Sequence, residues 1–140
     1  MNDILRYPEP FICLVRHGET ELSVARRYNG LGDIALTTNG EGQARSIAAS
    51  LNNVDWESVL ASPLKRARRT AELAGFANPE IVEGLREFDY GECEGKTTSE
   101  VLEKHPGWDF WQHGCPGGET LKKAGRRLDG VIEKLHSYKG

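Results

Sequence analysis

The chain has 140 residues, of which 38% are apolar and 28% charged, and its formal net charge is −3. These values are typical of one globular domain over residues 1–140, and they disfavour a general nucleic-acid-binding protein, which would carry a basic balance. No apolar run is long enough to span a membrane, and the chain does not open with a basic segment followed by an apolar one, so neither a membrane anchor nor a signal peptide is expected.

The predicted elements alternate between strands and helices. In chain order they are a strand at Phe11–Arg16, a long loop over 18–37, a helix from Thr38 to about Leu51, a strand at Val59–Ala61, a helix after Ser62-Pro63, a strand at Glu80–Val82, a short helix at Thr98–Lys104 and a helix from about Glu119 to Ser137. The first strand is expected to be buried on both faces, because its residues are uninterruptedly apolar up to Val15. Such alternation predicts an α/β layered sheet.

Two helices carry further signals. Thr38 and Glu41 have the spacing of a capping box, which predicts the start of the first helix. The last helix is expected to bury an apolar stripe at helical spacing, formed by Leu121, Ala124, Leu128, Val131, Ile132 and Leu135. The aromatic cluster that precedes this helix, Trp108 to Trp111, is expected to belong to the core rather than to a pocket.

Four reactive or charged side chains follow the ends of the three predicted strands. Arg16 and His17 end the first strand, Arg66 comes shortly after the second, and Glu87 follows the third. Strand ends of this kind meet where ligands bind in open α/β sheets. A guanidinium matches phosphate oxygens, an imidazole nitrogen can attack phosphorus, and a carboxyl can protonate a leaving oxygen. Although each residue taken alone is more often structural, their convergence favours a phosphate-transferring site.

Three segments, LVRHGET, ASPLKRARRTAE and LREFDYGECEG, resemble the signature segments of the histidine phosphatase superfamily, also called the phosphoglycerate mutase-like family. The resemblance implies a three-layer α/β/α sandwich with a mostly parallel sheet. It also implies that His17 becomes a phosphohistidine, that Arg16 and Arg66 bind the phosphoryl group, and that Glu87 is the proton donor. The family needs no metal, the sequence has no obvious metal-ligand motif, and no cofactor is expected.

Two further segments, YNGLGDIALTTNGEGQ and WDFWQHGCPGGET, resemble a branch of small phosphatases that includes fungal sedoheptulose-bisphosphatase and bacterial acid phosphatases. By position in that branch, five residues are expected to contact phosphate or substrate: Ser23, Asn29, Gly30, Ser62 and Tyr90. The resemblance implies a phosphomonoesterase for small phosphorylated metabolites, with sugar phosphates favoured and inorganic phosphate as product. A phosphoglycerate mutase is the alternative, but mutases usually carry Trp-Asn where this chain has Leu22-Ser23, and they have a longer insertion after the position of Gly95.

One group expected from the resemblance is absent. Members of the family bring a second histidine to the phosphate from a later strand, in a Ser-His-Gly context that none of the four histidines of this chain has. The domain is therefore expected to be incomplete at its C-terminus, to be nearly inactive as the 140-residue chain, and to expose an unpaired edge and apolar surface. The same gap raises a further alternative, a catalytically inactive module that binds a phosphorylated ligand.

The cysteines and the charge balance also predict the environment of the protein. Cys13, Cys93 and Cys115 are widely spaced and suggest no disulfide framework, so they are expected to be reduced, as in the cytoplasm. No membrane and no nucleic-acid partner is expected, whereas the oligomeric state and the individual substrate are not specified by any residue pattern.

Overall fold

Eleven short or medium elements build the chain in a computed structural model that describes residues 10–139. In order they are α1 (Glu21–Val24), α2 (Thr38–Ser46), α3 (Ala48–Leu51), β1 (Leu60–Ala61), α4 (Lys65–Leu73), β2 (Glu80–Ile81), η2 (Glu83–Leu85), η3 (Gly91–Cys93), α5 (Thr98–Lys104), α6 (Phe110–His113) and α7 (Leu121–His136). The start of the chain, for which the sequence predicts no signal peptide, lies in residues 1–9, outside the described residues.

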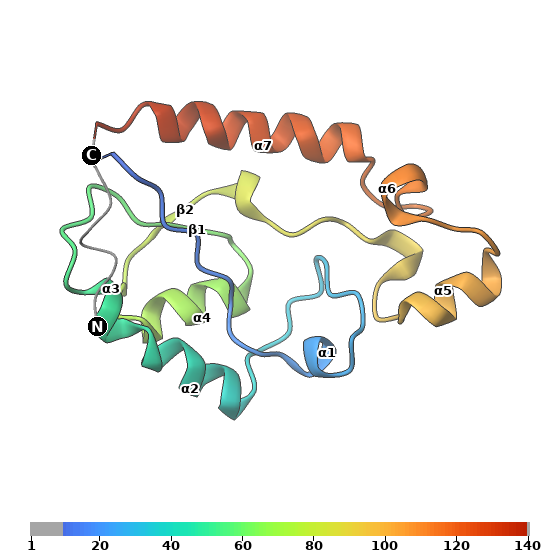
Figure 1. Cartoon of the computed structure of the whole chain (residues 1–140), viewed down its shortest axis with the longest axis horizontal. Coiled ribbons are helices and arrows are strands. Elements are labelled where there is room, and N and C mark those ends of the chain that lie inside the picture. The colour runs from blue at the N-terminus through green and yellow to red at the C-terminus, as the bar shows by residue number, and fades with distance from the viewer. Residues whose placement is uncertain (1–9, 140) are drawn as a thin grey trace.

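β1 and β2 form a two-stranded parallel sheet in which Leu60 pairs with Glu80 and Ala61 with Ile81. α2 packs against α4, which also contacts β1, while α7 contacts η2 on the other side of the sheet (Figure 1). This is the α/β architecture that the sequence predicts, with helices on both sides of a small parallel sheet. The predicted strands near 60 and 80 and the short helix at 98–104 are confirmed.

The predicted strand at Phe11–Arg16 is wrong. No ladder pairs residues 12–16 with any other described residue, and the side chains of Ile12, Leu14 and Val15 are 59%, 88% and 47% exposed. Residues 11–17 and β1 instead line one cavity of about 630 Å³. The cavity separates the segment 11–17 from β1, and the two do not pair. An apolar run indicates a tendency to be buried, but it does not supply the neighbouring strand that a ladder requires.

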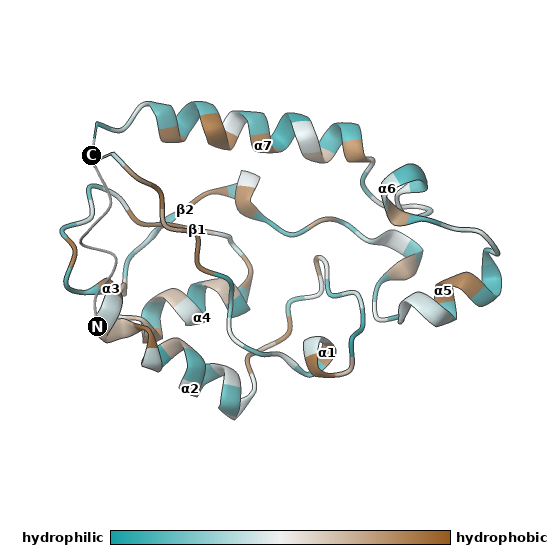
Figure 2. Cartoon of the chain, in the orientation of Figure 1, coloured by the Kyte–Doolittle hydropathy of each residue, from teal (hydrophilic) through white to brown (hydrophobic). Residues whose placement is uncertain are grey.

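α7 buries only part of its predicted apolar stripe. Ala124 and Val131 are buried, whereas Leu128 and Ile132 are 46% and 49% exposed. Figure 2 shows hydrophobic residues both along α7 and along the segment that leads to His17. The exposed apolar surface that the sequence predicts is therefore present on these two parts of the molecule. The helix itself begins two residues later than expected, where the hydroxyl of Thr120 accepts a hydrogen bond from the amide of Lys123.

The first long helix is capped by Thr37, so the predicted capping box at Thr38 and Glu41 is wrong by one residue. The Thr37 hydroxyl accepts from the amide of Gly40 at 3.0 Å and donates to the Glu19 carboxylate at 2.7 Å. This second bond selects Thr37 over its neighbour and could not be found from helix propensity. The helix also stops at Ser46, and α3 follows as a separate turn in place of one continuous helix.

Two glycines bring the backbone next to His17 directly against α2. A Cβ atom on Gly40 would lie 2.1 Å from the carbonyl oxygen of Glu19, and one on Gly18 would lie 2.3 Å from the carbonyl oxygen of Gly40. The amide of Gly18 also donates to the hydroxyl of Thr70 on α4 at 3.0 Å. Backbone packing on α2 and a hydrogen bond to α4 therefore position the loop that carries His17.

Gly40→Ala is expected to lower the free energy of unfolding by about 1–3 kcal/mol, because its methyl group would overlap backbone atoms that have no rotamer to change. Gly42→Ala is the matched control in the same helix, since nothing lies within 4 Å of its Cβ position. That control should stabilise the chain by about 0.5–1 kcal/mol through helix propensity. Urea denaturation of both variants measures the difference, and equal stability would contradict the close contact.

Candidate active site

A cavity of about 200 Å³ lies beside His17 and collects most of the predicted site residues. The residues that line it are Arg16, His17, Ser23, Arg26, Arg27, Tyr28, Asn29, Glu87 and Tyr90. Three predicted site residues, Gly30, Ser62 and Arg66, do not line it. Of the described histidines, His17 alone borders the cavity, and His105, His113 and His136 are exposed elsewhere.

The imidazole of His17 is held with one nitrogen free. Its Nδ1 lies 2.7 Å from the carbonyl oxygen of Gly18, and because a carbonyl can only accept, Nδ1 carries the proton and Nε2 keeps a lone pair. Burial lowers the pKa of His17 below its ordinary 6.5, and the positive charges of Arg66 and Arg16 lower it further, against the raising effect of the Gly18 carbonyl. The ring is therefore kept neutral near pH 7, as a nitrogen nucleophile requires.

The titration of His17 is expected to have its midpoint below pH 6.5, which can be followed by the ring-proton NMR signals of the folded chain. Arg16→Gln removes one positive charge and should move this midpoint upward, toward higher pH. The arginine Arg68, exposed on α4 without a partner among the described residues, supplies the control: Arg68→Gln should move the midpoint less. A midpoint above 6.5 in the unaltered chain would contradict the arrangement.

Arg66 is the second residue of α4, and its side chain is turned toward the loop 29–32. The residue is 1% exposed, and its guanidinium donates to the carbonyl oxygens of Asn29, Gly30 and Gly32 at 3.1, 2.8 and 3.0 Å. It also donates to the Asn29 side chain at 3.3 Å. Arg66 borders the larger cavity together with His17, so it acts on the imidazole by its charge while its donors hold the loop.

Glu94 holds the same loop from its amide side. Its carboxylate accepts from the amide of Gly30 at 2.9 and 3.1 Å and from the amide of Gly32 at 3.3 Å. A Cβ on Gly30 would lie 2.4 Å from the carbonyl oxygen of Phe88, so no larger residue fits this position without a shift. Gly30 thus has a structural part in the site. Glu94 is missed from the sequence because no periodicity distinguishes it from the other acidic residues of LREFDYGECEG.

Glu87 and Tyr90 face the cavity from the segment that follows β2 and η2. One carboxylate oxygen of Glu87 accepts from the next amide, that of Phe88, at 2.8 Å. Burial, followed by the nearby charge of Glu87, raises the pKa of Tyr90 to about 12. Its phenol therefore stays protonated and can donate a hydrogen bond to an anion in the cavity.

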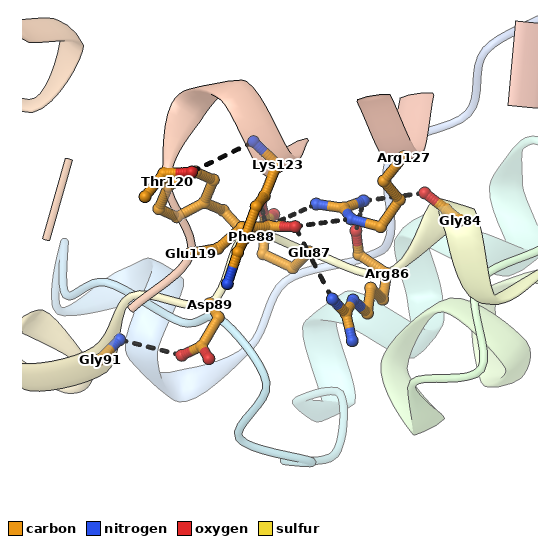
Figure 3. Close-up of polar contacts among 10 residues, drawn as sticks. All are labelled: Gly84, Arg86, Glu87, Phe88, Asp89, Gly91, Glu119, Thr120, Lys123 and Arg127. Atoms are coloured by element: carbon orange, nitrogen blue, oxygen red, sulfur yellow. Dashed lines mark hydrogen bonds and ion pairs between the residues drawn. The ribbon is translucent and has the colours of Figure 1, made fainter. Parts of the chain in front are cut away.

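An ion pair at the start of α7 holds this segment in place (Figure 3). Glu119, which is buried, accepts from Arg127 at 2.6 and 2.9 Å. The same guanidinium donates to the carbonyl oxygens of Gly84 and Arg86 at 2.8 and 2.9 Å, and the amide of Glu119 donates to the carbonyl oxygen of Asp89 at 2.8 Å. The backbone is therefore fixed on both sides of Glu87.

The hydroxyl groups of the two predicted serines form hydrogen bonds with backbone groups of nearby residues. Ser23 borders the cavity, but its hydroxyl closes the capping box of α1 with Thr20. Ser62 lines the larger cavity, beside His17 and Glu87, and accepts from the amide of Leu64 at 3.4 Å. Asn29 lies on the cavity wall, with its amide group 3.4 Å from the Thr20 hydroxyl. The Ser23 hydroxyl is therefore used within α1, whereas the Ser62 hydroxyl proton is not donated to any described residue.

Arg26 and Arg27 line the cavity and are missed by the sequence interpretation, which treats 18–37 as one long loop. The amides of Arg26 and Arg27 donate to the carbonyl oxygens of Ser23 and Leu22, the hydrogen-bond pattern of a Schellman motif at the end of α1. Arg27 is paired with Glu100 at 2.6 Å. The available signal was only the doubled arginine directly before Tyr28-Asn29-Gly30.

Other parts of the described chain add no competing site. Trp108 and Phe110 pack against the buried cluster of Cys93, Val101 and Cys115, which confirms their predicted place in the core, whereas Trp111 is 75% exposed. All three cysteines are free. Among residues 10–139 no three His, Cys, Asp or Glu side chains are grouped to hold a metal ion, and no helix there has both the length and the apolar character to cross a bilayer.

Comparison with known proteins gives matches along most of the chain. Residues 12–140 match the histidine phosphatase superfamily, branch 1. The chain is 37% identical to an acid phosphatase of Mycobacterium tuberculosis, covering 86% of this chain and 61% of that protein. It is 34% identical to sedoheptulose 1,7-bisphosphatase of Saccharomyces cerevisiae, covering 91% of this chain and 56% of that protein. The chain thus spans about three fifths of the length of these curated relatives.

A comparison of the fold with solved structures also gives a close match. The solved structure of an open reading frame product of Mycobacterium tuberculosis superposes with a TM-score of 0.81 at 35% identity, covering 88% of this chain and 65% of that one. The family match covers far more than half of the chain, and it includes the segments that carry His17, Arg66 and Glu87. The chain therefore belongs to the histidine phosphatase superfamily.

Proposed function

We propose that this chain forms the His17-bearing part of a single-domain, metal-independent phosphomonoesterase that works through a phosphohistidine intermediate. The observation that carries the proposal is the state of His17, whose Nδ1 is bonded to the Gly18 carbonyl and whose lowered pKa keeps Nε2 unprotonated. A neutral imidazole beside arginines, in a cavity of about 200 Å³, suits attack on a phosphate monoester.

In the first step Nε2 of His17 attacks phosphorus, so that a P–N bond forms while the P–O bond to the alcohol breaks. The carboxyl group of Glu87 gives its proton to the departing oxygen, which is within its reach because Glu87 and His17 line the same cavity. In the second step the Glu87 carboxylate takes a proton from water, which attacks phosphorus and breaks the P–N bond. Inorganic phosphate leaves, and both side chains return to their starting states.

Three side chains are proposed to stabilise the phosphoryl oxygens. Arg16 has no side-chain partner among the described residues and lines the cavity, so its guanidinium is available to an anion. Tyr90 offers a phenol that stays protonated. Arg66 contributes its charge from behind the loop 29–32, whose position it maintains.

The proposed substrates are small phosphorylated metabolites, with sugar phosphates favoured. The relatives named acid phosphatase and sedoheptulose 1,7-bisphosphatase support phosphate esters of small molecules. The size of the cavity suits a phosphoryl group and a few neighbouring atoms. The net charge of −3 disfavours nucleic-acid partners, and the three free cysteines suit a cytoplasmic protein.

The decisive experiment is to trap the intermediate. The 140-residue chain is incubated for hours with isotope-labelled acetyl phosphate, so that a single transfer per molecule is detected even where turnover is slow, and it is then quenched in base and mapped by mass spectrometry. We expect an acid-labile phosphoryl group on His17, none on the His17→Asn variant, and unchanged labelling of the His136→Asn control, whose altered side chain is exposed at the end of α7. Labelling at another residue, or none at all, would overturn the proposal.

A further inference from the structure

Arg26 has a backbone conformation that its residue type disfavours. Its φ of 54° is the only positive value among the described non-glycine residues. It occupies the position after the end of α1 where a Schellman motif favours glycine, because a side chain in the left-handed region is strained. Local helix termination therefore does not explain an arginine here, and its place on the cavity wall suggests a different reason.

The charge of Arg26 is not neutralised by the protein. Among the described residues its side chain has no hydrogen-bond or ion-pair partner, whereas its neighbour Arg27 is bound by Glu100 at 2.6 and 3.2 Å and donates to the Gly95 carbonyl at 2.8 Å. Glu87 is the only carboxylate on the wall of this cavity among the described residues. Two arginines on the cavity wall, Arg16 and Arg26, therefore have no side-chain partner among the described residues.

The two arginines reach the cavity from different parts of the chain. Arg16 directly precedes His17, whereas Arg26 lies beyond the end of α1. Both nevertheless border the same cavity. A ligand that places its phosphoryl group at His17 and Arg16 would bring its remaining atoms toward Arg26.

We propose that Arg26 binds a second anionic group of the substrate, so that the site prefers phosphate monoesters bearing a further phosphate or carboxylate. The proposal rests on the proposed function, because the first phosphate is taken to occupy the His17 end. Arg26 would then be a specificity-determining residue, and the strain of its backbone would be offset only when such a ligand is bound.

The test measures binding to the His17→Asn chain by calorimetry at low salt, so that turnover does not interfere. The ligands are the monophosphate and the bisphosphate of 1,3-propanediol and the phosphate ester of 3-hydroxypropionate. They carry one phosphate, two phosphates, and one phosphate with one carboxylate. We expect at least one of the doubly anionic ligands to bind about tenfold more tightly than the monophosphate.

Arg26→Gly should abolish this preference while leaving the monophosphate affinity unchanged. Glycine is the residue favoured at this backbone position, so the variant should be at least as stable as the parent, and lost affinity cannot be ascribed to unfolding. Arg68→Ala is the matched control, since it removes one positive charge from the exposed face of α4 and should keep the preference.

Two outcomes would overturn the assignment of Arg26. One is an unchanged preference in the Arg26→Gly variant, and the other is an equal loss of affinity for mono- and bisphosphate, which would place Arg26 at the first phosphate. Failure of all three ligands to bind, together with failure to label His17, would overturn the proposed function and this proposal with it. Labelling of His17 without any preference for a second anion would leave the function standing and exclude the role of Arg26.

Discussion

Replacing Arg66 with methionine is expected to lower the free energy of unfolding by about 3 kcal/mol or more. Arg66 is 1% exposed, and its guanidinium donates to three backbone carbonyls and the Asn29 side chain, all within the loop 29–32. Methionine fills similar space but donates no hydrogen bond, and each buried acceptor left without a partner costs about 1–3 kcal/mol. The loss is measured by urea denaturation, with the slope of the transition checked for two-state behaviour.

Arg68→Met provides the matched control on the same helix. Arg68 is exposed and has no side-chain partner among the described residues, so its replacement should change stability by no more than about 0.5 kcal/mol. Hydrogen exchange at the amides of Gly30 and Gly32 gives a second readout, because Glu94 keeps these amides bonded only while the loop stays in place. If Arg66→Met were as stable as Arg68→Met, the guanidinium would not hold the loop.

The sequence predicted which residues gather at the cavity better than how they are held there. Arg16, His17 and Glu87 border one cavity as expected, but residues 11–16 form no strand, so the meeting of three strand ends is not what brings them together. That Arg66 binds the phosphoryl group stays a prediction, and the sequence did not indicate that its two terminal nitrogens donate to the loop 29–32. The direction in which a long side chain points depends on which acceptors surround it in the folded chain, and residue order does not encode those neighbours.

Errors in the predicted fold have a common physical origin. The strand at 11–16 and the full stripe of α7 were inferred from apolar patterning, which indicates what tends to be buried but not against what it packs. The helix cap moved from Thr38 to Thr37 because a tertiary bond to Glu19 selects one hydroxyl. By contrast, β1, β2 and α5 lie where predicted, since strong local signals bound each of them.

Arg26 and Glu94 show the limit of reasoning from local pattern alone. Glu94 binds amides 62 and 64 residues away in the chain, a separation that no short window can reveal. Arg26 breaks a local rule, the preference for glycine after a helix, and such breaks are expected where function constrains the chain. A search for residues that contradict their predicted local structure would have marked Arg26 only after the end of α1 was known.

Replacing Arg127 with methionine is expected to cost about 3 kcal/mol of stability, because it removes both hydrogen bonds to the buried carboxylate of Glu119 and leaves it only the longer ion pair with Arg86, at 3.7 Å. It also removes the donors to the carbonyl oxygens of Gly84 and Arg86, next to Glu87. Arg126→Met changes the exposed neighbour on α7, which has no side-chain partner among the described residues, and should change stability by no more than about 0.5 kcal/mol.

The loss should depend on pH in a defined direction. Hydrogen bonding to Arg127 lowers the pKa of Glu119 below its ordinary 4.5. A carboxyl whose pKa is lower in the folded chain contributes stability that is complete above its ordinary pKa and is lost as pH falls through the folded value. The stability difference between the parent and Arg127→Met is therefore expected to be constant near neutral pH and to shrink once the pH falls below about 4.5.

A double-mutant cycle separates this ion pair from the other contacts of Arg127. Glu119→Gln, Arg127→Met and the double variant are compared by urea denaturation, and the coupling energy is expected to be about 1–3 kcal/mol in favour of the pair. Arg127 would still fix the segment around Glu87 through the Gly84 and Arg86 carbonyls in the Glu119→Gln variant, so that variant should lose less stability than Arg127→Met. A coupling energy of zero would mean that the guanidinium and the carboxylate do not stabilise the fold as a pair. Equal losses of stability in the two single variants would mean that the hydrogen bonds from Arg127 to the Gly84 and Arg86 carbonyls add no stability of their own.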